Sequence, residues 1–173
     1  MNQFKLIQRI SLIILLFLIT SCTNNNSMKP EDFKNKEPRL IIEEYLNGNI
    51  KAWGILQNRS GEVIRQFSAD LNGKWDGQYL ILDEKFNWND GEIQNRKWKI
   101  KKIDDHNYEG TADDVVGTAK GFSYGPAFKF EYVLLVPVKG KEMKITFDDW
   151  IFLQDENVAI NRAKMSKFGF KVA

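Results

Sequence analysis

Few side chains in this 173-residue sequence could carry out acid–base or metal chemistry, and their spacing is unfavourable for it. Asp113-Asp114 and Asp148-Asp149 are adjacent carboxylates, but successive residues of a strand point to opposite faces of a sheet. The only histidine, His106, falls in a predicted turn, and Cys22 is the only cysteine. These residues supply neither the usual zinc ligands nor a nucleophile with its base. We therefore predict no catalytic residue, no metal and no cofactor, and an enzyme is the less favoured interpretation.

Cys22 is the residue whose surroundings predict a definite chemistry. Lys5 and Arg9 give the chain a positive start, and residues 10–19 are apolar apart from one serine. A positive start, an apolar run of about 7–15 residues and small residues before a cleavage point define a secretory signal. An ordinary transmembrane helix needs about 20 apolar residues. Residues 1–21 are therefore predicted to be a signal peptide.

The Leu-Ile-Thr-Ser-Cys segment that ends at Cys22 resembles the bacterial lipobox. The resemblance implies that the Cys22 thiol takes a diacylglycerol, since a thiolate is the nucleophile that carries the lipid, and that the freed amine can take a further acyl chain such as palmitate. Two or three chains anchor a protein durably, whereas one does not. The polar residues 22–38 are predicted to be a flexible tether. In a Gram-negative host, aspartate at the position after the acylated cysteine retains lipoproteins at the inner membrane, so Thr23 at that position favours the periplasmic face of the outer membrane.

Composition argues for one neutral domain. Removal of residues 1–21 takes Lys5 and Arg9 from the 25 basic residues, which leaves 23 basic against 23 acidic residues. This balance provides no clustered positive surface for nucleic acid, so no nucleic-acid partner is expected. The remaining length suits a single domain, which we place at residues 39–173.

Short alternating segments separated by turn signals predict an all-β fold. No three-turn amphipathic helix is visible, and only residues 38–46 could form a short helix or, equally, a strand. Even spacing of short strands is typical of a sandwich or barrel. We predict a single antiparallel, lipocalin-like β-barrel or strongly curved sheet of about eight to ten strands. The turn signals are Arg59-Ser60-Gly61, Asp76-Gly77, Asn89-Asp90-Gly91, residues 104–107, Lys139-Gly140 and Asp155-Glu156-Asn157.

Three hairpins can be aligned, because facing residues share one side of a sheet. A two-residue turn at Asp76-Gly77 would place Phe67 opposite Phe86. A three-residue loop at Asn89-Asp90-Gly91 would place Glu84 opposite Arg96. A two-residue turn at Gly140 would place Phe128 and every second residue after it opposite the odd-numbered residues between 143 and 153.

These alignments place four charged residues on the apolar, inward side: Arg65, Glu84, Arg96 and Asp149. An unpaired charge there is costly and needs a partner. One interpretation is a structural ion-pair network. The other is a polar anchor for the head group of an otherwise apolar ligand. Four aromatic residues are expected to share this candidate site: Trp88, Trp98, Phe130 and Tyr132.

Several further motifs stand out along residues 44–170. They are Tyr45-Leu46-Asn47-Gly48, Ala52-Trp53-Gly54, Asp83-Glu84, Phe86, Trp98, Ile100, residues 108–113, Phe147-Asp148-Asp149-Trp150, Asn161-Arg162 and Phe168-Gly169-Phe170. Together they resemble a family of bacterial lipoproteins known as domain-of-unknown-function family 3833. The resemblance implies lipoprotein character and a lipocalin-like barrel, but no activity. Members usually continue into another short strand, whereas this chain stops at Ala173.

Three functions remain open at this stage. The first is non-catalytic binding or carriage of an apolar or amphipathic, lipid-like small molecule by a protein tied to the membrane through its N-terminal lipid. The second is a structural or interaction lipoprotein with a filled barrel, for which Trp150 and Phe152 would offer an outward apolar patch. The third and least favoured is an envelope enzyme that uses Glu84 and Asp149.

Overall fold

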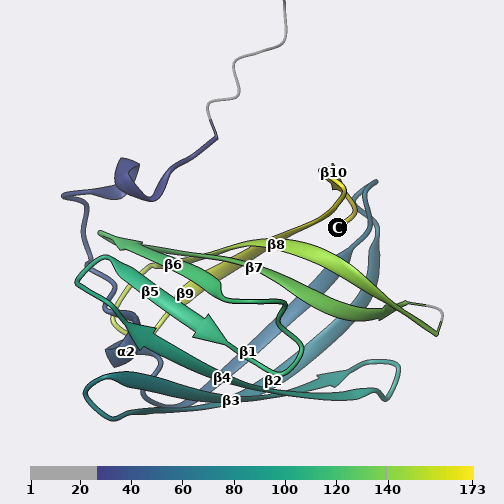
Figure 1. The fold of residues 1–173 in the computed structure, drawn as a ribbon, viewed down its shortest axis with the longest axis horizontal. Coiled ribbons are helices and arrows are strands. Elements are labelled where there is room, and N and C mark those ends of the chain that lie inside the picture. The colour runs from purple at the N-terminus through teal and green to yellow at the C-terminus, as the bar shows by residue number, and fades with distance from the viewer. Residues whose placement is uncertain (1–26, 139) are drawn as a thin grey trace, which may run out of the picture.

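The computed structural model describes residues 27–138 and 140–173, so Cys22 and the predicted signal peptide lie outside the described residues. Ten antiparallel strands follow one another in a single sheet, each hydrogen-bonded to the next along the chain. The sheet is strongly curled, so that β1–β4 form one layer and β6–β9 the other, with β5 between them (Figure 1). The strands are β1 (Gly48–Gln57), β2 (Val63–Trp75), β3 (Tyr79–Trp88), β4 (Ile93–Lys102), β5 (Asn107–Thr111), β6 (Ala119–Tyr124), β7 (Ala127–Val138), β8 (Lys141–Leu153), β9 (Ala159–Lys167) and β10 (Phe170–Lys171).

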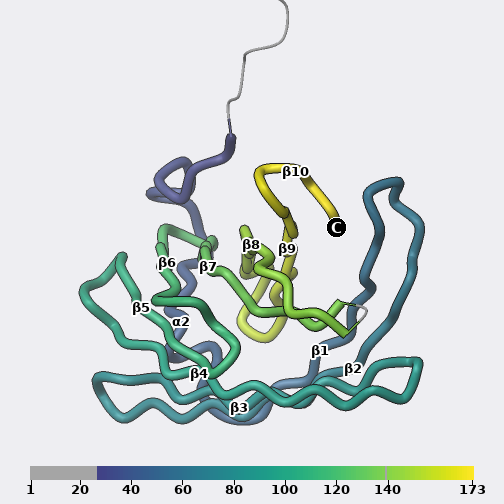
Figure 2. The backbone as a smooth tube through the Cα atoms, turned by 45° about the vertical axis from the view of Figure 1, so that its right-hand side comes forward, coloured from purple at the N-terminus to yellow at the C-terminus, as the bar shows by residue number. Residues whose placement is uncertain are grey.

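Of the two forms that the sequence allows, the curled sheet is the one found. Within the described residues the edge strand β1 pairs only with β2, and neither β9 nor β10 pairs with it. The ends of the sheet approach without joining (Figure 2). Hydrogen bonding between the described strands therefore does not close the barrel.

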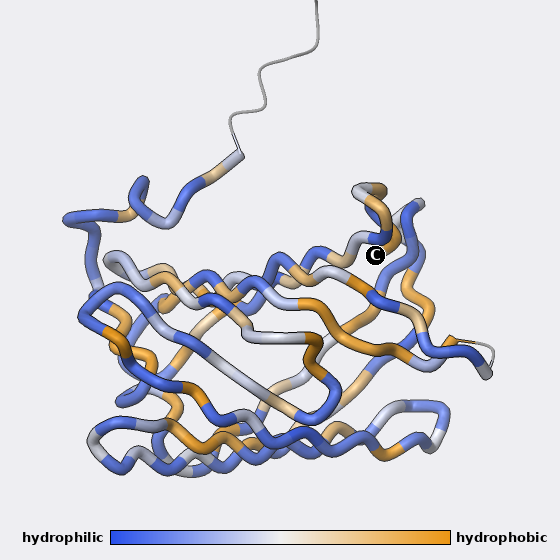
Figure 3. The backbone as a smooth tube through the Cα atoms, in the orientation of Figure 1, coloured by the Kyte–Doolittle hydropathy of each residue, from blue (hydrophilic) through white to orange (hydrophobic). Residues whose placement is uncertain are grey.

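Two of the three predicted registers are confirmed. Gly91 adopts a φ of 87° in the three-residue loop between β3 and β4, and Glu84 lies opposite Arg96. The β7–β8 hairpin places Phe128 opposite Ile151 and Phe130 opposite Asp149. Figure 3 shows the longest hydrophobic stretch of the sheet along β7.

The register predicted for the β2–β3 hairpin is wrong by two residues. Phe67 lies opposite Trp88 rather than Phe86, because the turn is wider than the two residues Asp76-Gly77. The carboxylate of Asp76 accepts hydrogen bonds from the backbone N–H groups of Gln78 and Tyr79, and this side-chain cap stabilises the wider turn. A shift of two preserves the face, so the inward side is as predicted.

One end of the curled sheet is sealed by the segment before β1. This segment contains the single turn α2 (Ile42–Tyr45) and inserts Leu40, Ile42 and Leu46 into the core. Glu43 of α2 is buried with them; its carboxylate accepts hydrogen bonds from Lys102 Nζ at 2.6 Å and Tyr108 Oη at 2.8 Å. A buried charge is tolerated only when it is paired in this way.

Part of the predicted tether is packed against the sheet. Its 3₁₀ turn η1 (Pro30–Phe33) places Phe33 on Trp150 and Phe152, with ring centroids 6.0 and 5.6 Å away. Trp150 points away from the inner face, as predicted, yet it is only 2% exposed. The outward apolar patch expected there is therefore covered by the chain itself. No helix within the described residues is long and apolar enough to span a bilayer.

Candidate functional site

A polar layer crosses the inner face at mid-height. Glu84, Arg96, Tyr132 and Asp149 come from β3, β4, β7 and β8, four strands that the curl brings face to face. Below this layer, toward α2, the interior is filled with large apolar side chains. Two of the aromatic residues expected at the site, Trp98 and Phe130, are packed there with ring centroids 5.0 Å apart, and the Trp98 ring also lies 5.2 Å from that of Tyr132 in the polar layer.

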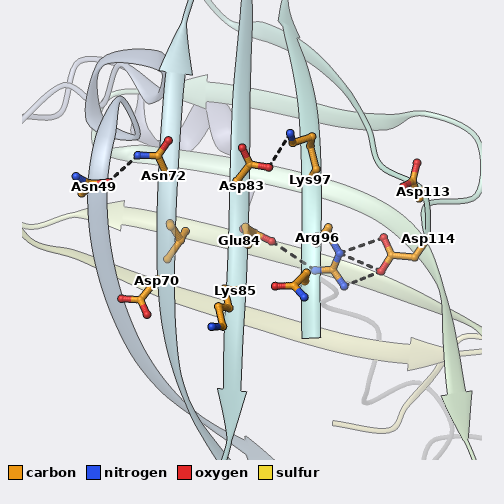
Figure 4. Close-up of a pocket in the computed structure, with 12 residues that line it drawn as sticks. Asn49, Asp70, Asn72, Asp83, Glu84, Lys85, Arg96, Lys97, Asp113 and Asp114 are labelled. Atoms are coloured by element: carbon orange, nitrogen blue, oxygen red, sulfur yellow. Dashed lines mark hydrogen bonds and ion pairs between the residues drawn. The ribbon is translucent and has the colours of Figure 1, made fainter. Parts of the chain in front are cut away.

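Arg96 interacts with two carboxylates, those of Glu84 and Asp114. Its Nη1 lies 3.7 Å from Glu84 Oε2, while its Nε donates to Asp114 Oδ1 at 3.1 Å and its Nη2 donates to Asp114 Oδ2 at 2.9 Å. Figure 4 shows Arg96 between the two acids. The two-point contact with Asp114 is the stronger interaction, because a planar guanidinium matches a carboxylate in this geometry.

Asp114 also contacts β7. It lies in the loop between β5 and β6, and its carbonyl accepts a hydrogen bond from the backbone N–H of Leu135 in β7. Arg96 thus connects β4 to β7 through this loop. Asp113, its neighbour, is exposed, so the two adjacent acids do not act together.

The second carboxylate of the inner face, Asp149, accepts two hydrogen bonds. Tyr132 Oη donates to its Oδ2 at 3.1 Å, and Asn161 Nδ2 donates to its Oδ1 at 2.6 Å. Burial raises the pKa of Asp149, although both hydrogen bonds act in the opposite direction. Asn161 is exposed on the edge strand β9, which gives this side of the polar layer a route to solvent.

Glu84 is the least satisfied polar group of the layer. Its Oε2 is shielded from solvent and accepts no hydrogen bond from the described residues. Burial raises the pKa of Glu84 to about 7, and this effect outweighs the nearby Arg96 charge, which acts to lower it. Near neutral pH Glu84 can therefore either donate or accept a hydrogen bond.

Arg65 and Trp88 share the inward face but lie apart from the polar layer. At the end of the sheet away from α2, Arg65 Nη2 donates to Asp90 and Glu92, each at 2.8 Å. Its guanidinium lies 4.0 Å from the centroid of the Trp88 ring. The sequence prediction grouped them with Glu84 because the alternation of residues along a strand tells which face a side chain is on. It does not tell how far along the strand axis that side chain lies from the others.

The inner face above the polar layer is apolar and only partly covered. Large side chains there remain half-buried, because β1 and β9 do not pair and no helix among residues 27–138 and 140–173 covers this end. These half-buried residues, which we call the open half, are Leu56, Phe67, Phe86, Trp88, Val136, Met143 and Met165.

Two surface depressions lie on the outward side of β1–β4 and are poor candidates. The larger, of about 640 Å³, borders Glu84, Arg96 and Asp114 but is lined mainly by outward polar residues, some of which already pair, as Lys97 does with Asp83 at 3.0 Å. The smaller, of about 600 Å³, lies over Trp53 and Ile55.

Sequence reasoning missed Asp114 and the Glu43–Lys102–Tyr108 group. Asp114 lies in a loop, where alternation gives no direction, and Glu43 lies 59 residues from Lys102. Within residues 27–138 and 140–173, no three His, Cys, Asp or Glu side chains are grouped so that they could hold a metal ion. The chemistry that the polar layer offers is hydrogen bonding and proton exchange by two carboxyl groups of raised pKa.

Comparison with known proteins gives a family but no function. No curated protein and no solved structure matches the chain. A family model described as "Protein of unknown function (DUF3833)" matches residues 16–173, which include every strand of the sheet and the whole polar layer. The chain therefore belongs to the DUF3833 family of proteins of unknown function.

Proposed function

We propose that this protein is a bacterial envelope lipoprotein that binds or carries an amphipathic, lipid-like small molecule and catalyses no reaction. Acyl chains on Cys22 would hold it at the periplasmic face of the outer membrane. The anchor is supported by the lipobox-like segment and the preceding apolar run. The binding role is supported by two properties of the inner face of the sheet, its half-buried apolar side chains and the unpartnered Oε2 of Glu84.

The observation that carries the binding role is the unpartnered Oε2 of Glu84 at the base of the open half. Buried polar atoms in native proteins nearly always have a hydrogen-bond partner. Ligand sites combine a predominantly apolar lining with a few polar groups that fix the orientation of the ligand. A bound head group would supply the missing partner, while the apolar body would cover Phe67, Phe86 and Met165.

The charges of the polar layer favour a neutral head group. Glu84 and Asp114 pair with the same Arg96, and Asp149 acts on Glu84 from nearby, so the layer has three carboxyl groups for one guanidinium and an anionic head group would meet repulsion. A hydroxyl or amide can donate to Glu84 Oε2 without that repulsion. A monoacylglycerol has the required parts, a hydroxylated head and one long chain.

A second candidate, a structural role with a filled interior, is favoured by the packing below the polar layer. The aromatic rings there contact one another and leave the lower half without room for a ligand. The two candidate functions differ in whether the open half takes up a ligand. The experiment therefore alters a side chain of that half.

The test compares two large-to-small substitutions on neighbouring strands. Phe67→Ala removes a ring from the open half, and Trp53→Ala removes an outward ring that is 74% exposed. Purified wild-type protein should gain resistance to urea unfolding on addition of monoolein, since a ligand that binds only the folded state stabilises it. Phe67→Ala should lose most of this gain and Trp53→Ala should retain it. Equal gains in all three proteins, or none in the wild type, would leave the structural role as the better account.

A further inference from the structure

The β9–β10 hairpin carries two large apolar side chains that nothing in the described chain covers. Phe168 is 88% exposed and Phe170 is 69% exposed. They flank Gly169 in a tight two-residue turn, closed by the pairing of Phe170 with Lys167. Burial of these rings therefore contributes little to the stability of the fold.

The backbone of this turn is also unsuited to phenylalanine. Phe168 has a φ of 50° and Gly169 a φ of 81°. Two positive φ values define a type I′ turn, whose first position prefers asparagine, aspartate or glycine. A bulky residue with positive φ is an outlier, and such strain often marks a functional position. The ring of Phe168 is almost fully exposed, and its contact with the Lys167 cation is the interaction found within the described chain to set against this strain.

Positive charge surrounds the two rings. Residues 157–173 contain four basic residues, among them Lys167 and Lys171 on either side of the turn, and no acidic residue. Lys167 Nζ lies 5.3 Å from the centroid of the Phe168 ring. Because the sequence after residue 21 is neutral as a whole, this basic hairpin is a local feature.

The hairpin projects from the same side of the molecule as two other segments. Figures 1 and 2 are related by a rotation about the vertical axis of the picture. In both views the β9–β10 turn and the tip of the β1–β2 hairpin reach the top of the sheet as drawn. The described chain also begins on that side, at Ser27. The β1–β2 hairpin adds the exposed side chains Val63 and Ile64.

We propose that the β9–β10 hairpin, Lys167–Lys171, is a membrane-contact element that inserts Phe168 and Phe170 into the interface of an anionic bilayer. Interfacial segments combine apolar side chains that enter the headgroup–acyl boundary with lysines that contact anionic lipid. The proposal rests on the proposed envelope location but not on ligand binding in the open half. Nucleic acid is less well suited, because single-strand sites line aromatic residues along a positive groove rather than at one turn.

A tryptophan placed in the turn tests the contact directly. The full-length chain carrying Phe168→Trp is incorporated into phosphatidylglycerol–phosphatidylcholine vesicles with or without brominated acyl chains, which quench nearby indoles. The matched control is Val158→Trp, a 51% exposed position at the opposite end of β9. The unsubstituted chain gives the background of the native tryptophans. We expect the fluorescence added at position 168 to be lost in brominated vesicles and that added at position 158 to be retained.

Further variants separate membrane contact from folding. Phe168→Asn should raise the urea midpoint of the protein, because asparagine fits the turn. The indole of Phe170→Trp should be quenched by brominated lipid, and it should be quenched less when Phe168→Asn is also present. Lys167→Glu with Lys171→Glu should weaken quenching at position 168.

Equal quenching at positions 168 and 158 would overturn the proposal, as would quenching at position 168 by a single-stranded oligonucleotide but not by bromolipid. Either result leaves the monoolein test at Phe67 unaffected, so the two proposals can fail separately.

Discussion

At the scale of single residues, Glu84 is a carboxyl group buried on the inner face of the sheet with one oxygen that accepts no hydrogen bond from the described residues. Its inward position was predictable from the Asn89-Asp90-Gly91 loop, since loop type fixes the register. Its missing hydrogen bond was not predictable, because Arg96 could have paired with it closely. In the structure Arg96 contacts Asp114 instead at hydrogen-bond distance, and Asp114 lies in a loop whose path alternation does not describe.

The raised pKa of Glu84 predicts a definite dependence of stability on pH. The folded-state pKa, about 7, lies above the value of 4.5 for an unperturbed glutamate. Between these values the folded state binds the proton and the unfolded state does not, so the contribution of Glu84 is full below pH 4.5 and is lost as pH rises through 7. At about 1.4 kcal/mol per pKa unit, the loss is on the order of 3 kcal/mol.

Urea unfolding at pH 5 and pH 8 measures this effect. The free energy of unfolding of the wild type should fall between the two values by more than that of Glu84→Gln, because glutamine does not titrate. The matched control is Asp83→Asn, the outward neighbour, whose side chain is 52% exposed. An identical pH profile for wild type and Glu84→Gln would show that Glu84 is hydrated.

At the scale of elements, the sequence predicts strands and faces better than it predicts contacts between strands distant in the chain. The β3–β4 and β7–β8 hairpins follow from glycine position and alternation, both local signals. The β2–β3 turn was misjudged because a side chain, Asp76, determines its width. The α2 segment and the β5–β6 loop are held by Glu43 and Asp114, whose partners are far away in sequence.

The Arg96–Asp114 contact should therefore be important for the continuity of the sheet. Arg96→Gln would leave Asp114 and Glu84 without their cation, and breaking a buried pair from one side costs roughly 3–5 kcal/mol. Lys97→Gln is the matched control, since Lys97 and Asp83 form an exposed pair with a value of about 0–1 kcal/mol. Chemical denaturation of both variants gives the comparison. Equal losses of unfolding free energy would mean that Arg96 is no more important than its exposed neighbour.

At the scale of the whole molecule, the open sheet follows from how its two halves are filled. The lower half has a sealed end and a continuous aromatic and aliphatic core, which is sufficient to hold the curl without hydrogen bonds between β1 and β9. The upper half lacks a plug, and large apolar side chains stay half-buried there. The number of strands was predictable from turn spacing; closure was not, because it depends on whether two edges meet in space.

The envelope location that we propose depends on acylation of Cys22. The described chain begins on the side from which the basic, aromatic β9–β10 hairpin projects, so an acyl anchor on Cys22 would bring that hairpin toward the bilayer. Cys22→Ser removes the thiol that would accept the diacylglycerol, and because Cys22 is the only cysteine no other side chain can replace it.

Cells that express wild type or Cys22→Ser and are fed radiolabelled palmitate provide the measurement. We expect label in the wild-type protein alone, and the wild-type protein in the detergent-extracted membrane fraction. Thr23→Ser is the control, since it alters the adjacent residue without removing the thiol, and it should be labelled like the wild type. Equal labelling of the Cys22→Ser protein would refute acylation at this site, and the orientation argued for the hairpin would then have to rest on Phe168, Phe170 and their flanking lysines alone.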